Sequence, residues 1–291
     1  MKIIRYFLEF AIVIIFFLIF KIIGLKLSSD LGEIIGKYFG PLFRKKTIAK
    51  KNILIVFPDL NEKSINEMID RMWKNIGRIF GEYIHINKFS VIDQKKIEIV
   101  FANKNNVEIL KNNNKPIVFF SGHFANFELM AKCLQELGFN IGAIYRPLNN
   151  IFLNPIMEFI RKKYICPIQI EKGSNGTKKL IKHISTNNPL ALMIDQRLSS
   201  SIRVPFFDQP ATTTITPAQL AIKYEALLVP VFLKRLEKTN FEFFIEEPLI
   251  IHRTSDYDKD IFNITHIMNK KIEEFIKKDP AHWLWSHDRW K

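Results

Sequence analysis

Short apolar runs and helix-like spacings alternate along most of the chain after Pro116. Strands are predicted where apolar residues run together between turn residues, and helices where they recur at steps of about three and four. The predicted strands are 117–121, 140–145, 167–170, 190–195, 227–233 and 241–245; the predicted helices are 126–137, about 155–163, 176–186, 217–225 and 261–277. This alternation is typical of an α/β fold, so we expect a mixed sheet flanked by helices.

A longer helix is predicted upstream, over 64–89. Its apolar residues include Ile65, Ile69, Met72 and Ile76, which follow helical spacing. The stretch "FPDLNEKS" before it supplies turn residues and a cap.

The first apolar segment, "YFLEFAIVIIFFLIFKII" at 6–23, contains only two charged residues, Glu9 and Lys21. Its length approaches the ~20 residues that cross a hydrocarbon core. An interfacial or buried helix stays an alternative, because Glu9 would be costly in lipid. A cleaved signal peptide is disfavoured, because no small-x-small cleavage site follows. We therefore expect an N-terminal transmembrane or membrane-surface helix.

We divide the chain into a membrane anchor at 1–27 and a single α/β domain at 28–291, because neither a repeat nor a low-complexity linker interrupts the rest. Basic residues flank the anchor: Lys2, Arg5, Lys21, Lys26, Lys37, Arg44, Lys45, Lys46, Lys50 and Lys51. The positive-inside tendency then predicts a body on the cytoplasmic side. "DLGEIIGKYFGPLF" at 30–43, with glycines among apolar residues, also suits a helix lying on an anionic bilayer.

The net charge of the protein limits the classes of binding partner that we expect. Lys and Arg outnumber Asp and Glu by 43 to 29, for a formal net charge of +14. Such a surface suits nucleic acid, acidic lipids or an acidic carrier protein, although each lysine alone also fits a solvated helix face. The lysines are scattered and no nucleic-acid motif is found, so we expect no nucleic-acid partner.

Several chemistries lose support. Cys133 and Cys166 are too few for a disulfide framework, and His282 and His287 lack a third ligand nearby, so we expect no metal. The sequence contains no P-loop, no dinucleotide fingerprint and no nucleophile elbow.

The candidate chemistry lies in "FFSGHFANFELM" at 119–130, where a predicted strand ends. His123 and Glu128 would be about 140° apart on a regular helix, so His123 must precede the helix. From there Glu128 could accept a hydrogen bond from one ring nitrogen and leave the other as a base. Without a serine nucleophile, this pair suits direct proton removal from a hydroxyl that attacks an activated acyl group. The same spacing also arises by chance. Gly122 and the helix N-terminus offer backbone N–H groups for an oxyanion or a phosphate.

At these residues the chain resembles a known family. "SGHFANFEL" is similar to the His-x4-acid signature of glycerolipid acyltransferases, and more closely to the "GHFGNWE" form of bacterial lipid A biosynthesis acyltransferases. "IYRPLNN" (144–150), "DQR" (195–197), "VPFFDQPATTT" (204–214) and "HWLWSHDRW" (282–290) extend the resemblance over nearly the whole chain. Within the family the lauroyl type is the most similar. Ala125 and Asp208 stand where glycine is usual, and Phe127 where tryptophan is frequent.

The resemblance implies a fold like that of glycerol phosphate acyltransferases. It also implies transfer of a fatty acyl chain from an acyl carrier protein thioester, or from acyl-CoA, to a hydroxyl of an anionic lipid A precursor. This would be a step of lipopolysaccharide biosynthesis at the cytoplasmic face of the bacterial inner membrane, with membrane lipids as partners and without cofactor or metal. His123 would be the general base and Glu128 its orienting acid. The expected substrate-binding residues are Gly122, Asn126, Arg146, Arg161, Asp195, Gln196, Thr212, Thr213 and Thr214.

Other functions stay open at this point. A glycerolipid acyltransferase would act on lysophosphatidate or glycerol phosphate, but its "EGTRS"-like block is replaced here by "DQRLSSS" at 195–201. A membrane-anchored basic binding module would need no catalysis. Hydrolysis of an acyl thioester would use the same His and Glu with water as acceptor.

Overall fold

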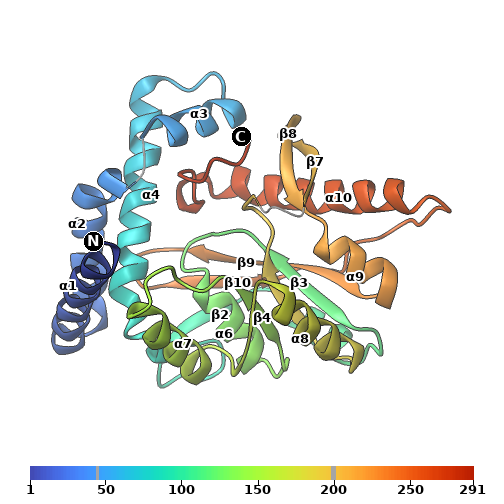
Figure 1. Cartoon of the computed structure of the whole chain (residues 1–291), viewed down its shortest axis with the longest axis horizontal. Coiled ribbons are helices and arrows are strands. Elements are labelled where there is room, and N and C mark those ends of the chain that lie inside the picture. The colour runs from blue at the N-terminus through green and yellow to red at the C-terminus, as the bar shows by residue number, and fades with distance from the viewer. Residues whose placement is uncertain (44–45, 198–200) are drawn as a thin grey trace.

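The computed structural model describes residues 1–43, 46–197 and 201–291, and a mixed sheet of eight strands runs through this part of the chain (Figure 1). The strand order is β1-β2-β10-β9-β3-β6-β4-β5. The strands are β1 (Phe89–Ser90), β2 (Ile97–Phe101), β3 (Ile117–Ser121), β4 (Gly142–Tyr145), β5 (Ile168–Glu171), β6 (Leu190–Met193), β9 (Leu227–Arg235) and β10 (Phe241–Ile245). Only β9 and β10 pair antiparallel within this sheet. The expected mixed α/β fold is confirmed.

Helices flank the sheet on both faces. They are α1 (Lys2–Ile23), α2 (Leu25–Phe43), α3 (Lys46–Val56), α4 (Glu62–Tyr83), α5 (Lys104–Lys111), α6 (Glu128–Glu136), α7 (Leu153–Tyr164), α8 (Ser174–Ser185), α9 (Thr216–Tyr224) and α10 (Tyr257–Lys278), with short 3-10 turns at Ile86–Lys88 and Pro280–His282. Arg44 and Lys45, part of the basic run after the anchor, lie outside the described residues.

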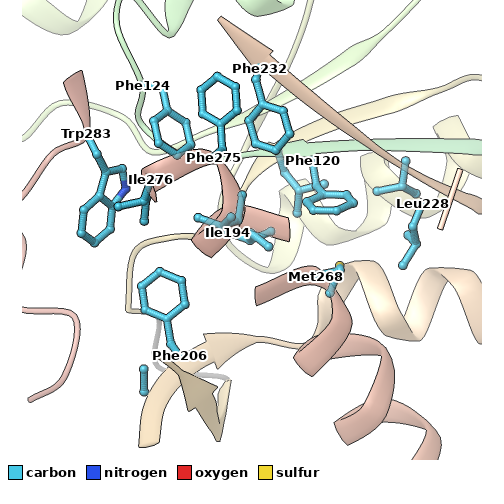
Figure 2. Close-up of a cluster of buried hydrophobic side chains, with 14 of the residues drawn as sticks. Phe120, Phe124, Ile194, Phe206, Leu228, Phe232, Met268, Phe275, Ile276 and Trp283 are labelled. Atoms are coloured by element: carbon cyan, nitrogen blue, oxygen red, sulfur yellow. The ribbon is translucent and has the colours of Figure 1, made fainter. Parts of the chain in front are cut away.

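The sheet separates two apolar cores, because successive side chains of a strand point to opposite faces. Phe120 of β3 belongs to the core that includes α9 and α10, whereas Phe119 belongs to the core that includes α6 and α7. Figure 2 shows the first core, where the rings of Phe232 and Phe275 stack with their centroids 4.0 Å apart. Every residue of β3 is buried, as a central strand covered on both faces requires.

Helix α2 packs tightly against α4, on the left of Figure 1. The helices approach through Gly32 and Gly36 of α2 and Gly77 of α4, and a Cβ at Gly77 would lie only 2.0 Å from the carbonyl oxygen of Gly32. The glycines of 30–43 therefore serve helix packing. Apolar residues on the rest of α2, such as Ile34 and Leu42, are exposed, so the expectation that this helix lies on a bilayer stays a prediction.

The sequence located the main elements but not all of them. The predicted strands 117–121 and 241–245 have the observed bounds of β3 and β10. The helix predicted over 64–89 ends at Tyr83, and a 3-10 turn and β1 follow. The hairpin of β7 (Ser201–Phe206) and β8 (Gln209–Thr214) was not predicted; it turns at Phe207 and Asp208, whose φ angles are 50° and 57°. Such left-handed positions favour glycine, which accounts for the glycine usual at 208.

Helix α1 is the one described helix that is long and apolar enough to cross a membrane. It fits a membrane anchor. The boundary placed between residues 27 and 28 falls inside α2, and the division into anchor and domain stays a prediction.

Candidate active site

His123 and Asp195 meet because of the register between two adjacent parallel strands. Ser121, the last residue of β3, pairs with Met193, the last residue of β6. His123 and Asp195 each follow two residues after these strand ends, so both side chains emerge at the carboxyl edge of the sheet. Open α/β sheets place ligands at this edge.

Three hydrogen bonds fix the Asp195 carboxylate. Oδ1 lies 2.7 Å from Nδ1 of His123, while Oδ2 accepts from the His123 backbone N–H at 2.7 Å and from Nε1 of Trp283 at 2.9 Å. Burial alone would raise the pKa of Asp195, but the charge of His123 and these hydrogen bonds outweigh it and lower the pKa to about 2. Asp195 is therefore the ionised partner that orients the imidazole ring.

The other ring nitrogen of His123, Nε2, is the candidate base, and its hydrogen-bond partner is the Gln196 amide. Because Nδ1 faces a carboxylate, the neutral ring carries its proton there and leaves a lone pair on Nε2. Nε2 lies 3.3 Å from Nε2 of the Gln196 side chain, and the His123 side chain is 16% exposed. Phe127 packs edge-on against the ring at 4.8 Å between centroids. This geometry is that of a general base held in a fixed tautomer.

The orienting role predicted for Glu128 is wrong. Its carboxylate accepts from Nε and Nη2 of Arg161, the Nε contacts measuring 3.2 Å, while the acid at Nδ1 of His123 is Asp195. Burial lowers the pKa of Arg161, but the charge and hydrogen bonds of Glu128 raise it by more, so the net shift is upward. A catalytic contribution of Glu128 stays a prediction, now through Arg161 rather than through contact with His123.

A cavity of about 290 Å³ opens beside His123. Its polar rim combines His123 and Gln196 with Glu128, Arg161, Arg146 and Lys172. Phe119, Met130, Leu134, Ile165 and Val231 form an apolar floor. Glu128, Ala131 and Leu134 line it from one face of α6, so the cavity follows that helix for roughly 9 Å. Such a space suits a flexible hydrocarbon chain with a polar group at one end.

Two cationic side chains, Arg146 and Lys172, lie on this rim. Arg146 follows β4 and Lys172 follows β5, and neither forms a salt bridge within the described part of the chain. Burial by neighbouring groups lowers the pKa of Lys172, and the nearby charge of Asp195 opposes this shift. Four adjacent parallel strands thus each deliver a polar side chain past their carboxyl ends, at His123, Gln196, Arg146 and Lys172.

The loop from Gly122 to Phe127 uses three of its six backbone N–H groups in hydrogen bonds within the protein. The N–H groups of His123, Phe124 and Ala125 donate to Asp195, to the Gly122 carbonyl and to the His282 carbonyl, respectively. Ala125 has a φ of 45°, a left-handed conformation that explains why glycine is usual there. Three of these N–H groups are therefore committed, and an oxyanion contact by Gly122 or by the N-terminus of α6 stays a prediction. A Cβ at Gly122 would lie 3.1 Å from Oδ2 of Asp195.

Asn126 does not line the cavity. Its side-chain amide donates to Glu82 of α4 at 2.8 Å, and Glu82 pairs with Arg235 at 2.6 Å in the interior. Asn75 of α4 also donates to the Ala125 carbonyl at 3.2 Å. These contacts hold the loop that carries His123, so the substrate-binding role predicted for Asn126 was wrong.

Thr212 and Thr213 also lie away from the cavity. Arg289, which is fully buried, donates to the Thr212 carbonyl and, at 2.8 Å, to Oγ1 of Thr213. Thr212 and Thr213 therefore serve the packing of the β7–β8 hairpin on the C-terminal segment, and the substrate-binding role predicted for these two was wrong. Thr214 lines another hollow, beside α8 and α9, that adjoins the cavity and shares Ile144, Lys172, Leu192 and Met193 with it. A substrate contact by Thr214 stays a prediction.

Sequence reasoning missed three residues of the site. Trp283 was not among the predicted site residues, although its indole N–H donates to Asp195. Lys172 and Tyr145 line the cavity and had not been singled out. Lys172 could have been found from its place two residues after the predicted strand 167–170, whereas no sequence pattern pointed to Trp283, 88 residues after Asp195.

A second hollow, of about 310 Å³, adjoins the first and shares Phe127, Glu128 and Arg161 with it. It lies among α1, α4 and α7 and is otherwise almost wholly apolar, being lined by Val13, Phe17, Ile76, Ile79, Phe80, Tyr83, Leu148, Leu153 and Met157. We call it the α1 groove.

Within residues 1–43, 46–197 and 201–291, no three His, Cys, Asp or Glu side chains are grouped so that they could hold a metal ion.

Comparisons with known proteins agree with this chemistry. The model of the bacterial lipid A biosynthesis acyltransferase family matches residues 1–291. A Haemophilus influenzae lipid A biosynthesis acyltransferase is 21% identical over 94% of this chain and 84% of its own length. Two Escherichia coli relatives, a lipid A biosynthesis palmitoleoyltransferase and a lauroyltransferase, are each 24% identical, over 90% and 91% of this chain and 84% of their own lengths.

A solved structure was also found to be similar: the 1-acyl-sn-glycerophosphate acyltransferase of Thermotoga maritima, with a TM-score of 0.40 and 11% identity over 89% of this chain and 96% of that one. The family match extends from the anchor through the site to the C-terminus. This match argues against a non-enzymatic binding module, because the members of the family are acyltransferases of lipid A biosynthesis. The chain belongs to the bacterial lipid A biosynthesis acyltransferase family.

Proposed function

We propose that this enzyme transfers a fatty acyl group from an acyl carrier protein thioester to a hydroxyl of a lipid A precursor. The observation that carries the proposal is that Nε2 of His123, with its tautomer fixed by Asp195, faces a cavity with an apolar floor. A base beside a hydrocarbon site suits an acyl donor whose carbonyl lies at the rim.

The reaction then needs no protein nucleophile. Nε2 of His123 takes the proton of the acceptor hydroxyl as its oxygen attacks the thioester carbonyl, and Asp195 stabilises the imidazolium that forms. The carbonyl oxygen becomes an oxyanion near the cation of Arg161. Collapse of the tetrahedral intermediate breaks the C–S bond, and the departing thiolate takes the proton back from His123. We propose no metal or other cofactor, because a thiolate leaves readily without one.

The two hollows would hold two hydrocarbon chains. We assign the donor chain to the cavity along α6, where Leu134 and Val231 form the deep end, and a chain already present on the acceptor to the α1 groove. Both hollows meet at Glu128 and Arg161, next to the base. Arg146 and Lys172 would contact a phosphate of the acceptor or of the carrier's prosthetic group. The +14 charge favours both the anionic glycolipid and an acidic carrier. We place the enzyme at the cytoplasmic face of the inner membrane, where that carrier is found.

The test uses the full-length protein in detergent. It is incubated with acyl carrier protein and coenzyme A thioesters of several chain lengths, with a tetra-acylated lipid A precursor or lysophosphatidate as acceptor, beside a His123→Ala control. Mass spectrometry should show one added acyl group on the lipid A precursor, lost in the control. Acylation of lysophosphatidate alone would show that the proposed acceptor is wrong. A preference for coenzyme A thioesters would show that the proposed donor is wrong.

A further inference from the structure

Helix α1 is bound to the body near its N-terminus. The side-chain amide of Asn150 donates to the Tyr6 carbonyl at 2.9 Å and to Oε2 of Glu9 at 3.1 Å. The ring of Phe152 packs against Phe7, with centroids 5.8 Å apart. Asn150 and Tyr6 are both buried. The segment just before α7 is therefore attached to the first turns of α1.

The same helix is bound to the body near its C-terminus. Nε2 of His85 lies 2.8 Å from the Phe20 carbonyl oxygen, and the Phe20 side chain is fully buried. Between the two ends, the ring of Phe17 packs against Phe80 at 5.7 Å. Tyr6 and Phe20 are fourteen positions apart, which corresponds to roughly 21 Å along the helix axis. The body therefore flanks α1 along most of its length instead of hanging from one end.

This attachment is incompatible with a helix that stands upright across a bilayer. If α1 followed the membrane normal, Asn150 and His85 would lie roughly 21 Å apart in depth, within a hydrocarbon core of about 30 Å. The irregular backbone between β4 and α7 would then be exposed to lipid, where its polar groups could not be satisfied. The charged last turn of α7, which carries Lys162 and Lys163, would also enter the hydrocarbon region.

The free surface of α1 has the pattern of a helix that lies flat. Its exposed apolar side chains are Ile3, Ile4, Phe7, Leu8, Ile12, Ile15, Leu18, Ile19 and Ile22. At about 100° per residue they cover one half of the helix circumference, opposite the side that packs on the body. Lys2, Arg5 and Glu9 fall outside that half, Lys21 lies at its edge in the last turn, and Arg5 pairs with Glu9 at 3.3 Å. Glu9 therefore need not enter hydrocarbon.

We infer that α1 lies in the plane of one leaflet, with its apolar half among the acyl chains and its N-terminus on the same side of the membrane as the body. The occupant of this surface is an anionic lipid leaflet. Exposed Leu27, Ile34 and Leu42 of α2 continue the apolar surface, and the basic residues flanking α1 suit acidic head groups. This inference does not depend on the reaction.

The first test compares sides of the membrane. Cys133 and Cys166 are buried, so they give little labelling background in the folded protein. Lys2→Cys, at the N-terminus, and Glu67→Cys, on the exposed face of α4 of the body, are placed singly in the full-length chain and treated with an impermeant maleimide in spheroplasts and in inverted vesicles. We expect both to react in the same preparation. Reaction in opposite preparations would establish a spanning helix and overturn the inference.

The second test measures depth. Ile4→Cys and Ile15→Cys, each carrying a fluorophore, are compared in liposomes of phosphatidylglycerol and phosphatidylethanolamine with quenchers at defined positions of the acyl chain. A helix in the plane places both probes at similar depths, whereas an upright helix separates them by roughly 16 Å. A clear difference in depth, or protection of both probes from every quencher, would overturn the inference. Neither readout requires catalysis, so an error in the proposed reaction would not affect it.

Discussion

The indole Nε1 of Trp283 donates a 2.9 Å hydrogen bond to Oδ2 of Asp195. Trp283 is nearly fully buried, and its backbone forms an antiparallel bridge with Phe124, the residue after His123. The C-terminal segment thus supports both members of the His123–Asp195 pair. Residues close to the end of the chain thereby hold the catalytic geometry built by the two parallel strands.

Replacing Trp283 by Phe should impair catalysis more than folding. An aromatic ring is kept, but one of three hydrogen bonds to Asp195 is lost, which typically costs about 1.5–3 kcal/mol when the acceptor is charged. We expect kcat to fall roughly tenfold with little change in KM, measured by transfer to the lipid acceptor. Trp285→Phe is the matched control, because its indole donates to the Pro280 carbonyl and not to the site. Equal losses in kcat for the two variants would refute a positioning role for Trp283.

Asp195 should make stability depend on acid pH. Its folded pKa lies below the ordinary value of 3.8, at about 2, so the unfolded chain binds the proton more readily. The resulting stabilisation is present above about pH 4 and is lost as the pH falls toward 2, and it amounts to about 2 kcal/mol. Urea unfolding of the detergent-solubilised protein at pH 5 and pH 2.5 should show a larger loss for the wild type than for Asp195→Asn. The prediction fails if both lose the same amount.

The strands of the site were predictable, whereas the partner of His123 was not. The run at 117–121 is apolar up to Ser121 and is bounded by Pro116 and Gly122, so the limits predicted for β3 were correct. The pairing of His123 with Asp195, 72 residues later, depends on β6 lying beside β3 while β4 lies beyond β6. No local pattern contains that strand order. Glu128 was chosen because it is near in sequence, and Arg161 of α7 holds it instead.

The missed hairpin has a local cause. Pro205 and Pro210 interrupt the apolar pattern of β7 and β8, and proline within a run argues against a strand. These two strands form a separate two-stranded sheet, where an unpaired edge tolerates proline. The turn at Phe207 and Asp208 also lacks the glycine that marks such turns.

Glu128 and Arg161 should be energetically coupled to each other. Their side chains are only 10% and 15% exposed, so removing one leaves a poorly solvated charge, at a cost of about 3 kcal/mol. We expect Glu128→Gln and Arg161→Gln to be destabilising singly and the double variant to lose less than their sum, by at least ~1 kcal/mol in urea unfolding. The control is Glu128→Gln combined with His123→Ala, for which the changes in the free energy of unfolding should add. Coupling to His123 instead of Arg161 would restore the role first predicted for Glu128.

Gly77→Ala should destabilise the packing of α2 on α4 without changing a residue of the active site. The new Cβ would meet the Gly32 carbonyl oxygen at 2.0 Å, so α2 and α4 must separate. Overpacking of this kind costs about 1–3 kcal/mol. The melting temperature should fall by several degrees, whereas Glu67→Ala on the exposed face of α4 should leave it nearly unchanged. A melting temperature equal to that of the control would show that the helices are not in close contact.

The two hollows should control different substrates. Leu134→Phe fills the deep end of the cavity along α6, so the enzyme should lose activity with long acyl donors, roughly tenfold, while keeping it with shorter ones. Met157→Trp fills the α1 groove, so KM for the lipid acceptor should rise several-fold while the preference for donor chain length stays unchanged. Product masses from a mixture of thioesters report the first effect, and acceptor titration reports the second. Because the hollows join only at Phe127, Glu128 and Arg161, each variant serves as the control for the other. If Met157→Trp shifted the donor chain length instead, the assignment of the acceptor chain to the α1 groove would be wrong, and the groove would have to be the far end of the donor site.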